Sequence, residues 1–297
     1  QSAAMHSGSI SHRKCLHKPS WPERPDNFTG DDFLEDLKRN LYVKRHSLLT
    51  VVVATGRVFQ HFCSLCLFVQ AYCLMLQGTL APETVLFGLG MLAPPLYLAY
   101  LFCASGSADK SDLSPMRTAF GHCRLLLVLT AFTLMWSPLL KSLTATISTD
   151  TIHAMTAFFL TANLLFHDYG GSAAIVSKSF SLNSAVFAAI CLASRLPSSL
   201  HTFTTVELAL FVFAFWPELR RNMSVGLHSP FQPVLSLGLT FLLNLAAQCA
   251  MCFISMPAAC CFLLLSCFIM LICPIMFVAM QAQKNNIHGP WDEAVIH

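Results

Sequence analysis

Residues Ser148 to Phe203 read STDTIHAMTAFFLTANLLFHDYGGSAAIVSKSFSLNSAVFAAICLASRLPSSLHTF and organise the rest of the chain. This stretch holds two apolar runs, each long enough to enter a bilayer, joined by the polar hinge Asp168-Tyr169-Gly170-Gly171. Polar groups at membrane depth are costly, so they usually face protein or water rather than lipid. We therefore expect this segment at the centre of a helical bundle. Its polar residues within or beside the runs are His153, Asn163, His167, Asp168, Lys178, Asn183 and Arg195.

The composition of the whole chain indicates an all-α, polytopic membrane protein. Of its 297 residues 55% are hydrophobic and 11% are charged, and the mean hydropathy is +0.60. A soluble domain carries about 25% charged residues. The deficit is too large to reflect a buried core alone, so we expect a membrane-spanning helical bundle. The basic residues do not form a patch of the kind that binds nucleic acid.

Eight apolar segments approach the length of about 20 residues that a spanning helix needs. Lys178 divides the fifth segment, so its first part can be an interfacial or re-entrant piece. Only Ser255-Met-Pro257 separates the last two segments, where the proline supplies a turn. The segments lie near residues 47–76, 83–104, 123–141, 150–167, 172–194, 200–217, 231–255 and 257–281.

Three regions follow from this division: a polar region 1–46, a transmembrane bundle 47–281 and a tail 282–297. Within the first region we expect a short amphipathic helix that begins near Asp31 or Asp32, either of which can cap it. This helix could dock against protein or contact lipid directly. Its apolar face would consist of Phe33, Leu34, Leu37 and Leu41.

The basic residues predict the orientation of the bundle. If the N-terminus is cytoplasmic, 15 Lys and Arg residues flank the spans on that side, against only Lys141 and Arg195 on the other. Loops rich in Lys and Arg stay in the cytoplasm, so both termini are predicted to be cytoplasmic. The sequons at Asn27 and Asn222 then lie on the cytoplasmic side and should carry no glycan.

Most of the thirteen cysteines lie in apolar runs, where a free thiol behaves as a small buried hydrophobe. Cys63-Ser-Leu-Cys66 and Cys249-Ala-Met-Cys252 have a spacing that can hold zinc or perform redox chemistry. Both pairs fall in the middle of a predicted span, without matching His or Cys partners. We therefore favour a packing role and expect neither a metal nor a cofactor.

Three polar groupings are candidates for chemistry. His167-Asp168-Tyr169 could serve acid–base or metal chemistry, but a cap-and-hinge role, with Asp168 accepting backbone N–H bonds, is favoured. Arg57 and Glu207 lie within the first and sixth spans, where an ion pair would offset the cost of burial. Arg195 could bind a phosphate or, as we favour, cap the end of the fifth span.

The sequence contains no GxSxG elbow, no P-loop, no Gly-rich nucleotide cradle and no paired-Asp motif of the lipid alcohol-phosphotransferase type. We therefore assign no catalytic residue. A lipid transporter or scramblase stays open as an alternative, as does an integral membrane enzyme with its site at His167 and Asp168.

Four blocks, in order from about residue 25 to the end, resemble the PIG-C family of subunits of the phosphatidylinositol N-acetylglucosaminyltransferase. The first two are Pro25-Asp-Asn-Phe28 with Phe33-Leu-Glu-Asp-Leu-Lys-Arg-Asn40, and Ser137-Pro-Leu-Leu-Lys-Ser-Leu-Thr144 with Ser148-Thr-Asp-Thr-Ile152. The third joins Asp168-Tyr-Gly170, Ala174-Ile-Val-Ser177 and Ser181-Leu-Asn183 to Cys191-Leu-Ala-Ser-Arg-Leu-Pro-Ser-Ser-Leu-His201. The fourth is Asn286-Ile-His-Gly-Pro-Trp-Asp-Glu-Ala294.

The resemblance implies a non-catalytic subunit in the endoplasmic reticulum membrane. Its complex would transfer N-acetylglucosamine from UDP-N-acetylglucosamine to phosphatidylinositol, the first step of glycosylphosphatidylinositol anchor synthesis. The implied partners are a catalytic PIG-A-like subunit and PIG-H-, PIG-P-, PIG-Q- and PIG-Y-like subunits. Candidate contacts with lipid or partners are Arg124, Asp168, Tyr169, Lys178, Asn183, Arg195, His201, Arg220, Arg221 and Trp291.

Overall fold

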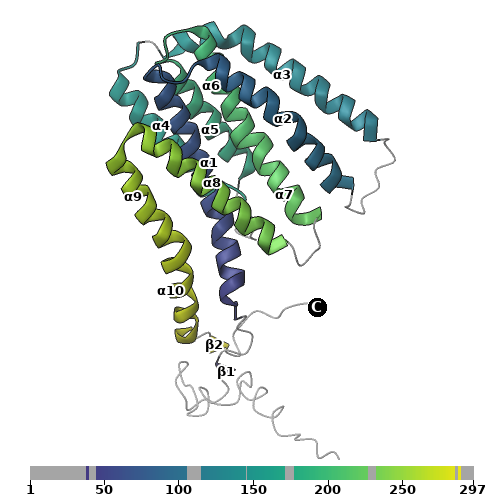
Figure 1. Cartoon of the computed structure of the whole chain (residues 1–297), viewed down its shortest axis with the longest axis vertical. Helices are drawn as coiled ribbons and strands as arrows, with labels where there is room; N and C mark the ends of the chain where they lie inside the picture. Colours follow the sequence, from purple (N-terminus) through teal and green to yellow (C-terminus); the bar gives the residue numbers. More distant parts are fainter. Residues whose placement is uncertain are drawn as a thin grey trace, which may run out of the picture. The chain divides into compact units, whose positions relative to one another are not determined.

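The computed structural model describes residues 38–39, 45–105, 115–144, 146–170, 177–226, 232–284 and 287–288. The chain divides into two compact units. One unit comprises Gln1–Arg45 with Met280–His297, and the other comprises His46–Ala279. The second unit is a bundle of helices and contains the candidate site (Figure 1).

A helix forms over each of the eight apolar segments, which confirms the all-α membrane bundle. By length and composition, six helices of the described chain could cross a membrane. The count of eight spans stays a prediction, because α4 and α5 do not meet these limits. The helices are α1 (Leu48–Leu76), α2 (Pro82–Ser105), α3 (Pro115–Leu143), α4 (Thr149–Phe166), α5 (Lys178–Ala193), α6 (Ser199–Leu210), η2 (Phe211–Phe215), α7 (Trp216–Gly226), α8 (Gln232–Ile254), α9 (Met256–Cys267), η3 (Phe268–Ile272), α10 (Cys273–Met280) and η4 (Gln281–Gln283).

Serine caps begin four of these helices. The hydroxyl oxygens of Ser47, Ser148, Ser177 and Ser198 each accept a hydrogen bond from the backbone N–H three residues on, at the starts of α1, α4, α5 and α6. A serine in this position satisfies one of the donors that the first helical turn leaves unpaired. Local sequence therefore fixes where these helices begin.

The sixth predicted segment ends too early, because α6, η2 and α7 form one continuous helix over residues 199–226. Pro217 lies inside this helix and has no N–H to donate to Phe213. The π turn of η2 ends at Phe215, just before the proline, and its wider backbone accommodates the break in the hydrogen-bond ladder. This extension carries Arg220 and Arg221.

The predicted amphipathic helix near Asp31 lies mostly outside the described residues. Its two described residues differ from the prediction, since β1 (Lys38–Arg39) pairs antiparallel with β2 (Ile287–His288). Lys38 lies opposite His288 and Arg39 opposite Ile287. The partner strand comes from the other end of the chain, which no local pattern in the sequence can reveal.

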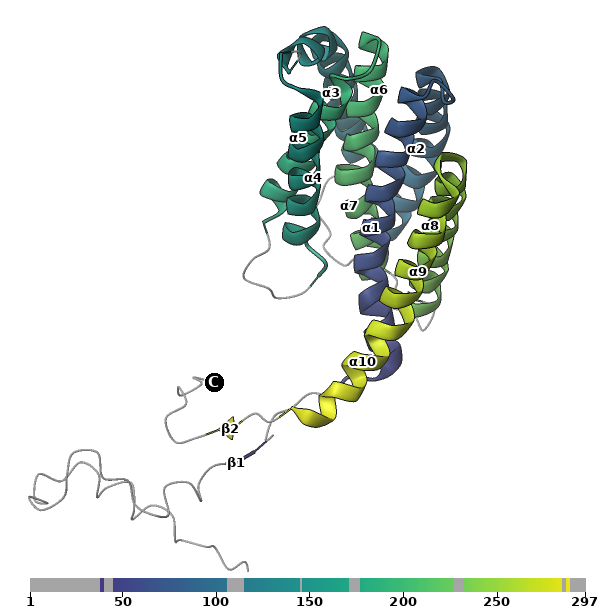
Figure 2. The same cartoon turned by 90° about the vertical axis from the view of Figure 1, so that its left-hand side faces the viewer.

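The views in Figures 1 and 2 show the helices of the bundle running alongside one another. Helix α1 packs against α8, α4 packs against α5, and α6 packs against both α3 and α5. Small residues make the closest approaches possible. Ala185, Ala188, Ala189 and Ala193 of α5 are fully buried, and the first three belong to the cluster that also holds Phe68.

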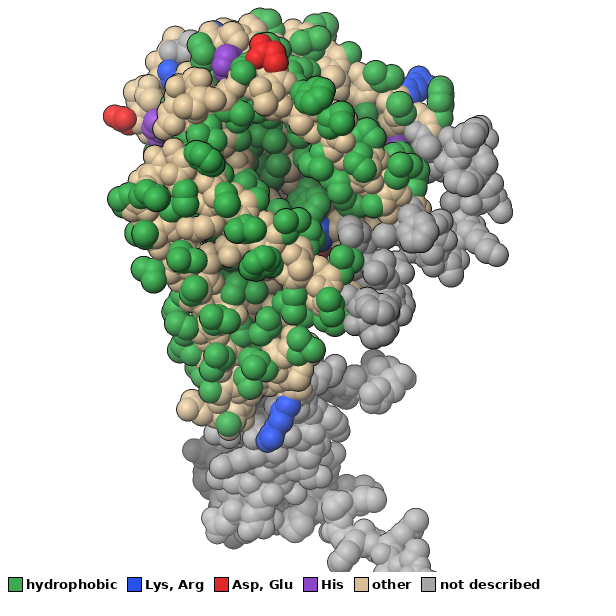
Figure 3. Space-filling view, in the orientation of Figure 1, with side chains coloured by type: hydrophobic (Ala, Val, Ile, Leu, Met, Phe, Trp, Pro, Cys, Tyr) green, Lys and Arg blue, Asp and Glu red, His purple; other side chains and the backbone are tan. Residues whose placement is uncertain are grey.

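Large apolar side chains also cover the outside of the bundle. Figure 3 shows hydrophobic side chains over most of the visible face of this unit and few charged ones. Phe120, Phe241 and Phe253 are 72%, 69% and 82% exposed. Exposed phenylalanines in such number suit contact with lipid, where apolar surface carries no penalty.

Candidate functional site

A pocket of about 290 Å³ lies at one end of the bundle. Its walls come from the first turns of α1, the segment after α4, helix α7 and the first turns of α8. The Lys and Arg count predicts the same side of the membrane for all four of these regions. The pocket-lining residues are Leu49, Thr50, Val53, Arg57, Gln60, Asp168, Tyr169, Gly170, Pro217, Arg220, Arg221, Gln232, Pro233, Leu235, Ser236 and Leu239.

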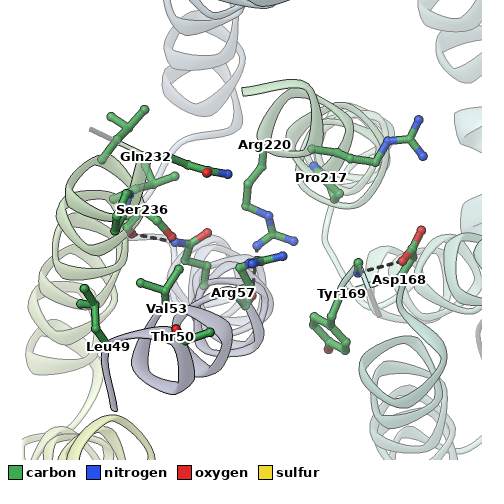
Figure 4. A pocket seen from close by; sticks show the side chains of 16 residues that line it. Leu49, Thr50, Val53, Arg57, Asp168, Tyr169, Pro217, Arg220, Gln232 and Ser236 are labelled. Carbon is green, nitrogen blue, oxygen red and sulfur yellow. Dashed lines mark hydrogen bonds between the residues drawn. The ribbon is translucent and has the colours of Figure 1, made fainter. Parts of the chain in front are cut away.

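Two arginines from different helices meet in this pocket. Arg57 of α1 and Arg220 of α7 point toward one another in Figure 4. Nη1 of Arg220 donates to the backbone carbonyl of Arg57 at 3.3 Å, and Nη2 of Arg220 donates to Nε2 of His167 at 3.3 Å. Both acceptors are neutral. Within the described chain, neither guanidinium has a carboxylate partner.

An aspartate, Asp168, also lines this pocket. Oδ2 of Asp168 lies 3.3 Å from Nζ of Lys178, and Oδ1 accepts a hydrogen bond of 2.9 Å from the N–H of Gly170. The bond from Gly170 and the nearby ammonium hold the pKa of the Asp168 carboxyl below its usual range. Asp168 is therefore ionised at neutral pH and satisfied by its own neighbours.

The predicted cap-and-hinge role of Asp168 is only partly matched by the turn that follows α4. Gly170 has a φ of +84°, in the left-handed region that a side chain disfavours. Asp168 does accept a backbone N–H, but the residue that caps α5 is Ser177, whose hydroxyl accepts from Phe180. Asp168 therefore stabilises the turn after α4 rather than the start of α5.

A buried polar network stands behind the arginines. The rings of His61 and His167 stack with their centroids 3.8 Å apart. Nε2 of His61 bonds to Oδ1 of Asn163 at 3.0 Å, and Nδ2 of Asn163 donates to the carbonyl and the hydroxyl of Ser181. Since the amide hydrogens go to Ser181, His61 must donate to Asn163. The network links α1, α4 and α5 to Arg220.

Tyr169 closes one side of the pocket. Its hydroxyl donates to the carbonyl of Leu164 at 2.7 Å, and its ring meets that of His167 edge-on with centroids 5.0 Å apart. Burial raises the pKa of Tyr169 to about 12. The side chain is therefore a neutral hydrogen-bond donor at any physiological pH.

The structure gathers some of the predicted contact residues and separates others. Asp168, Tyr169, Arg220 and Arg221 line the pocket, and Lys178 pairs with Asp168. Arg124 and Asn183 lie on α3 and α5, away from the pocket lining, and Trp291 lies outside the described residues.

The two remaining candidates, Arg195 and His201, are held by other local contacts. Nη2 of Arg195 donates to the carbonyls of Thr144 and Ile147, between α3 and α4, so the predicted cap on α5 is wrong. His201 bonds through Nδ1 to the hydroxyl of Ser198 at 2.7 Å. Neither residue is part of the pocket lining.

The predicted ion pair between Arg57 and Glu207 does not form. Glu207 accepts a hydrogen bond from the hydroxyl of Thr133 on α3, and Arg57 lines the pocket. Arg220, which contacts the backbone of Arg57, follows Glu207 by thirteen residues on one continuous helix. That separation corresponds to about 20 Å along the helix axis. The two charges therefore lie at different depths in the bundle.

Sequence reasoning named Arg57 for the wrong contact and did not include Gln60 among the site residues. Gln60 is 1% exposed and lies on α1, three residues from Arg57, so that both side chains share a helix face. The sequence did contain a signal for Gln60: it is a polar residue in an apolar helix, three positions after a cation, and residues at that spacing lie on the same helix face. Gln232 and Ser236 of α8 carried no comparable signal.

Together the fold and the pocket define a polytopic membrane protein whose helical bundle carries a cationic, partly apolar site at one end. The chain matches the family described as "GPI2: Phosphatidylinositol N-acetylglucosaminyltransferase" over residues 12–292, and it belongs to that family.

Named relatives agree with this assignment. The chain is 42% identical over 272 residues to the C subunit of phosphatidylinositol N-acetylglucosaminyltransferase from Mus musculus, covering 92% of this chain and 89% of the relative. It is 41% identical over 273 residues to the corresponding protein of Bos taurus, with the same coverage. The GPI2 subunit of Schizosaccharomyces pombe is 31% identical over 290 residues, 95% of this chain and 87% of the relative. No solved structure matches the chain.

Proposed function

We propose that this chain is a non-catalytic membrane subunit of the transferase that attaches N-acetylglucosamine to phosphatidylinositol. In this role the bundle holds a catalytic subunit that binds UDP-N-acetylglucosamine at the endoplasmic reticulum membrane. The pocket of Arg57 and Arg220 holds the phosphate of the lipid acceptor on the cytoplasmic side. Holding two reactants in a fixed geometry contributes a large part of a rate enhancement.

The observation that carries this proposal is the pair of arginines without a carboxylate. A guanidinium in a partly buried site is stabilised by an anion, and a buried charge is normally paired. Among the described residues, the hydrogen-bond acceptors that Arg220 contacts are neutral, and a second arginine stands beside it. Arginine also suits phosphate geometrically, because two parallel N–H groups can bond two oxygens.

The shape of the pocket supports a lipid rather than a soluble anion. Leu49, Val53, Leu235 and Leu239 form an apolar wall beside the arginines. The glycerol next to the phosphate of a lipid could pack on such a wall while the phosphate reaches the guanidinium groups. Nε2 of His167 is already engaged by Arg220, and both carboxylate oxygens of Asp168 are engaged by Gly170 and Lys178, which disfavours the alternative of an acid–base site there.

The test uses the assembled complex, purified from cells that carry variants of this chain. Arg57→Gln should lower transfer of N-acetylglucosamine from UDP-N-acetylglucosamine to phosphatidylinositol at least about tenfold, since a charge-assisted contact is lost. Arg57→Lys should retain part of the activity. Recovery of the partner subunits should match that of the unaltered chain. Full activity of Arg57→Gln would refute the role of the pocket.

A second experiment separates a scaffold from the alternatives. The chain reconstituted alone in liposomes should leave UDP-N-acetylglucosamine intact, whereas an integral enzyme would consume it. It should not speed exchange of labelled phospholipid between leaflets, which a scramblase would do. Turnover or exchange by the isolated chain would contradict the proposed role.

A further inference from the structure

Gln60 lines the pocket and has one hydrogen-bond acceptor that the described residues leave unused. Its Nε2 donates to the carbonyl of Ser236 at 2.9 Å and to the hydroxyl of Thr240 at 2.8 Å. Both amide hydrogens are thus used, and the orientation of the side chain is set by α8. The remaining atom, Oε1, is buried and has no partner within the described chain. Gln60 itself lines the pocket.

Two other glutamines with a buried Oε1 provide a comparison for this position. Gln70 and Gln248 also bond through Nε2 to a backbone carbonyl and leave Oε1 without a partner in the described chain. Neither of them lines the pocket. An unpartnered Oε1 alone therefore says nothing about a ligand. Of the three, only Gln60 lines the pocket, which also holds Arg57 and Arg220.

The chemistry of these groups restricts the ligand. A guanidinium only donates hydrogen bonds, so Arg57 and Arg220 require anionic oxygens. A carbonyl oxygen only accepts, so Oε1 of Gln60 requires a donor. An ammonium group could donate, but two nearby guanidinium charges would repel it. A choline headgroup has no N–H to give. A neutral hydroxyl satisfies Oε1 without either problem.

We propose that the pocket recognises a phosphodiester whose alcohol carries neutral hydroxyl groups, with Arg57 and Arg220 on the phosphate and Gln60 accepting from one hydroxyl. Phosphatidylinositol has this chemistry. The proposal rests on the proposed function and deepens it, because it assigns headgroup selectivity to one residue. A volume of about 290 Å³ lies at the lower limit for ligand sites, about 300 Å³, and so suits a headgroup rather than a whole lipid.

The test measures lipid retained by the full chain in detergent after equilibration with phosphatidylinositol or phosphatidic acid. Both lipids carry a phosphate, but only the first carries hydroxyls on an alcohol headgroup. Gln60→Met should lower retention of phosphatidylinositol about fivefold, the size of one neutral hydrogen bond, and leave phosphatidic acid unchanged. Arg57→Gln should lower retention of both lipids.

Two controls match Gln60→Met. Gln70→Met makes the same change on the same helix, ten residues or about 15 Å away, and should alter neither lipid. Thr240→Val removes a bond to Nε2 of Gln60 but keeps Oε1, and should preserve the difference between the lipids. These controls separate loss of the acceptor from general loosening of the contact between α1 and α8.

Competition on the unaltered chain tests the idea even if Gln60→Met does not fold. myo-Inositol 1-phosphate should displace bound phosphatidylinositol at about fivefold lower concentration than inorganic phosphate does. Equal displacement would overturn the selectivity proposal, as would an equal effect of Gln60→Met on both lipids. If Arg57→Gln leaves both lipids bound, the proposed function itself fails. The two failures are therefore distinguishable.

Discussion

The imidazole rings of His61 and His167 are stacked with centroids 3.8 Å apart and planes inclined by 7°. His61 comes from α1, and His167 follows α4. Nη2 of Arg220 donates to His167, whose Nε2 must therefore be unprotonated. The stack thus links the bond between His61 and Asn163 in the bundle interior to the guanidinium in the pocket. We treat His167 as a positioning residue for Arg220.

Two substitutions at His167 separate its two contacts, the ring stack with His61 and the hydrogen bond from Arg220. His167→Phe keeps a ring against His61 but removes the acceptor for Arg220, so retention of phosphatidylinositol should fall about threefold with little change in Tm. His167→Gln supplies a new acceptor without the stack and should recover part of the binding while lowering Tm. His153→Phe, at an exposed position on α4, is the control. Unchanged binding by His167→Phe would show that Arg220 needs no such support.

Gly170→Ala should weaken both folding and binding. The residue has a φ of +84°, and an added β-carbon would lie 3.3 Å from Nη1 of Arg57. The backbone strain costs about 1–2 kcal/mol of unfolding free energy, and the methyl displaces the guanidinium. Gly78→Ala is the matched control, because Gly78 has a φ of +72° with nothing within 4 Å. Both variants should lose similar stability, but only Gly170→Ala should lose lipid. Equal lipid retention by the two would argue against the contact with Arg57.

The bond between Thr133 and Glu207 predicts a stability effect away from the pocket. Thr133→Val removes the hydroxyl that donates to the Glu207 carboxylate and should cost about 1–3 kcal/mol of unfolding free energy. Thr133→Ser should restore most of it. Reversing the charges of Arg57 and Glu207 together should rescue neither single reversal. Mutual rescue in thermal unfolding would instead place those two charges in contact.

The turn at Asp168 predicts a particular pH dependence. The bond from the N–H of Gly170 and the Lys178 ammonium lower the pKa of Asp168 relative to the unfolded chain, where it is about 3.9. The resulting stability is fully present above the unfolded pKa and is lost only as the pH falls through the folded pKa. Asp168→Asn should therefore lower Tm by about 2 °C to the same extent at pH 8 and pH 5. If Asp168→Asn lowered Tm at pH 8 but not at pH 5, the lowered pKa of Asp168 would be contradicted.

Much of the bundle could be read from local sequence because its determinants are local. Apolar length predicts where helices enter a membrane, and serine caps at Ser47, Ser148 and Ser198 begin three of them. Helix α5 begins at Lys178, and the expectation for the first part of the fifth segment stays a prediction because residues 172–176 lie outside the described chain. The extension of the sixth helix past Pro217 was not predicted, because the pattern of apolar residues does not reveal the π turn that accommodates the proline.

Hydropathy is a property of each residue, so the order of residues was enough to predict a membrane bundle with polar groups around Asp168. Which polar groups meet depends on how the helices pack. Arg57 and Arg220 are 163 residues apart, and their contact depends on how α1 and α7 pack. The same packing leaves Glu207 with Thr133 and turns Gln60 toward the pocket. Helix packing is set by the whole core, so no local stretch could assign these partners.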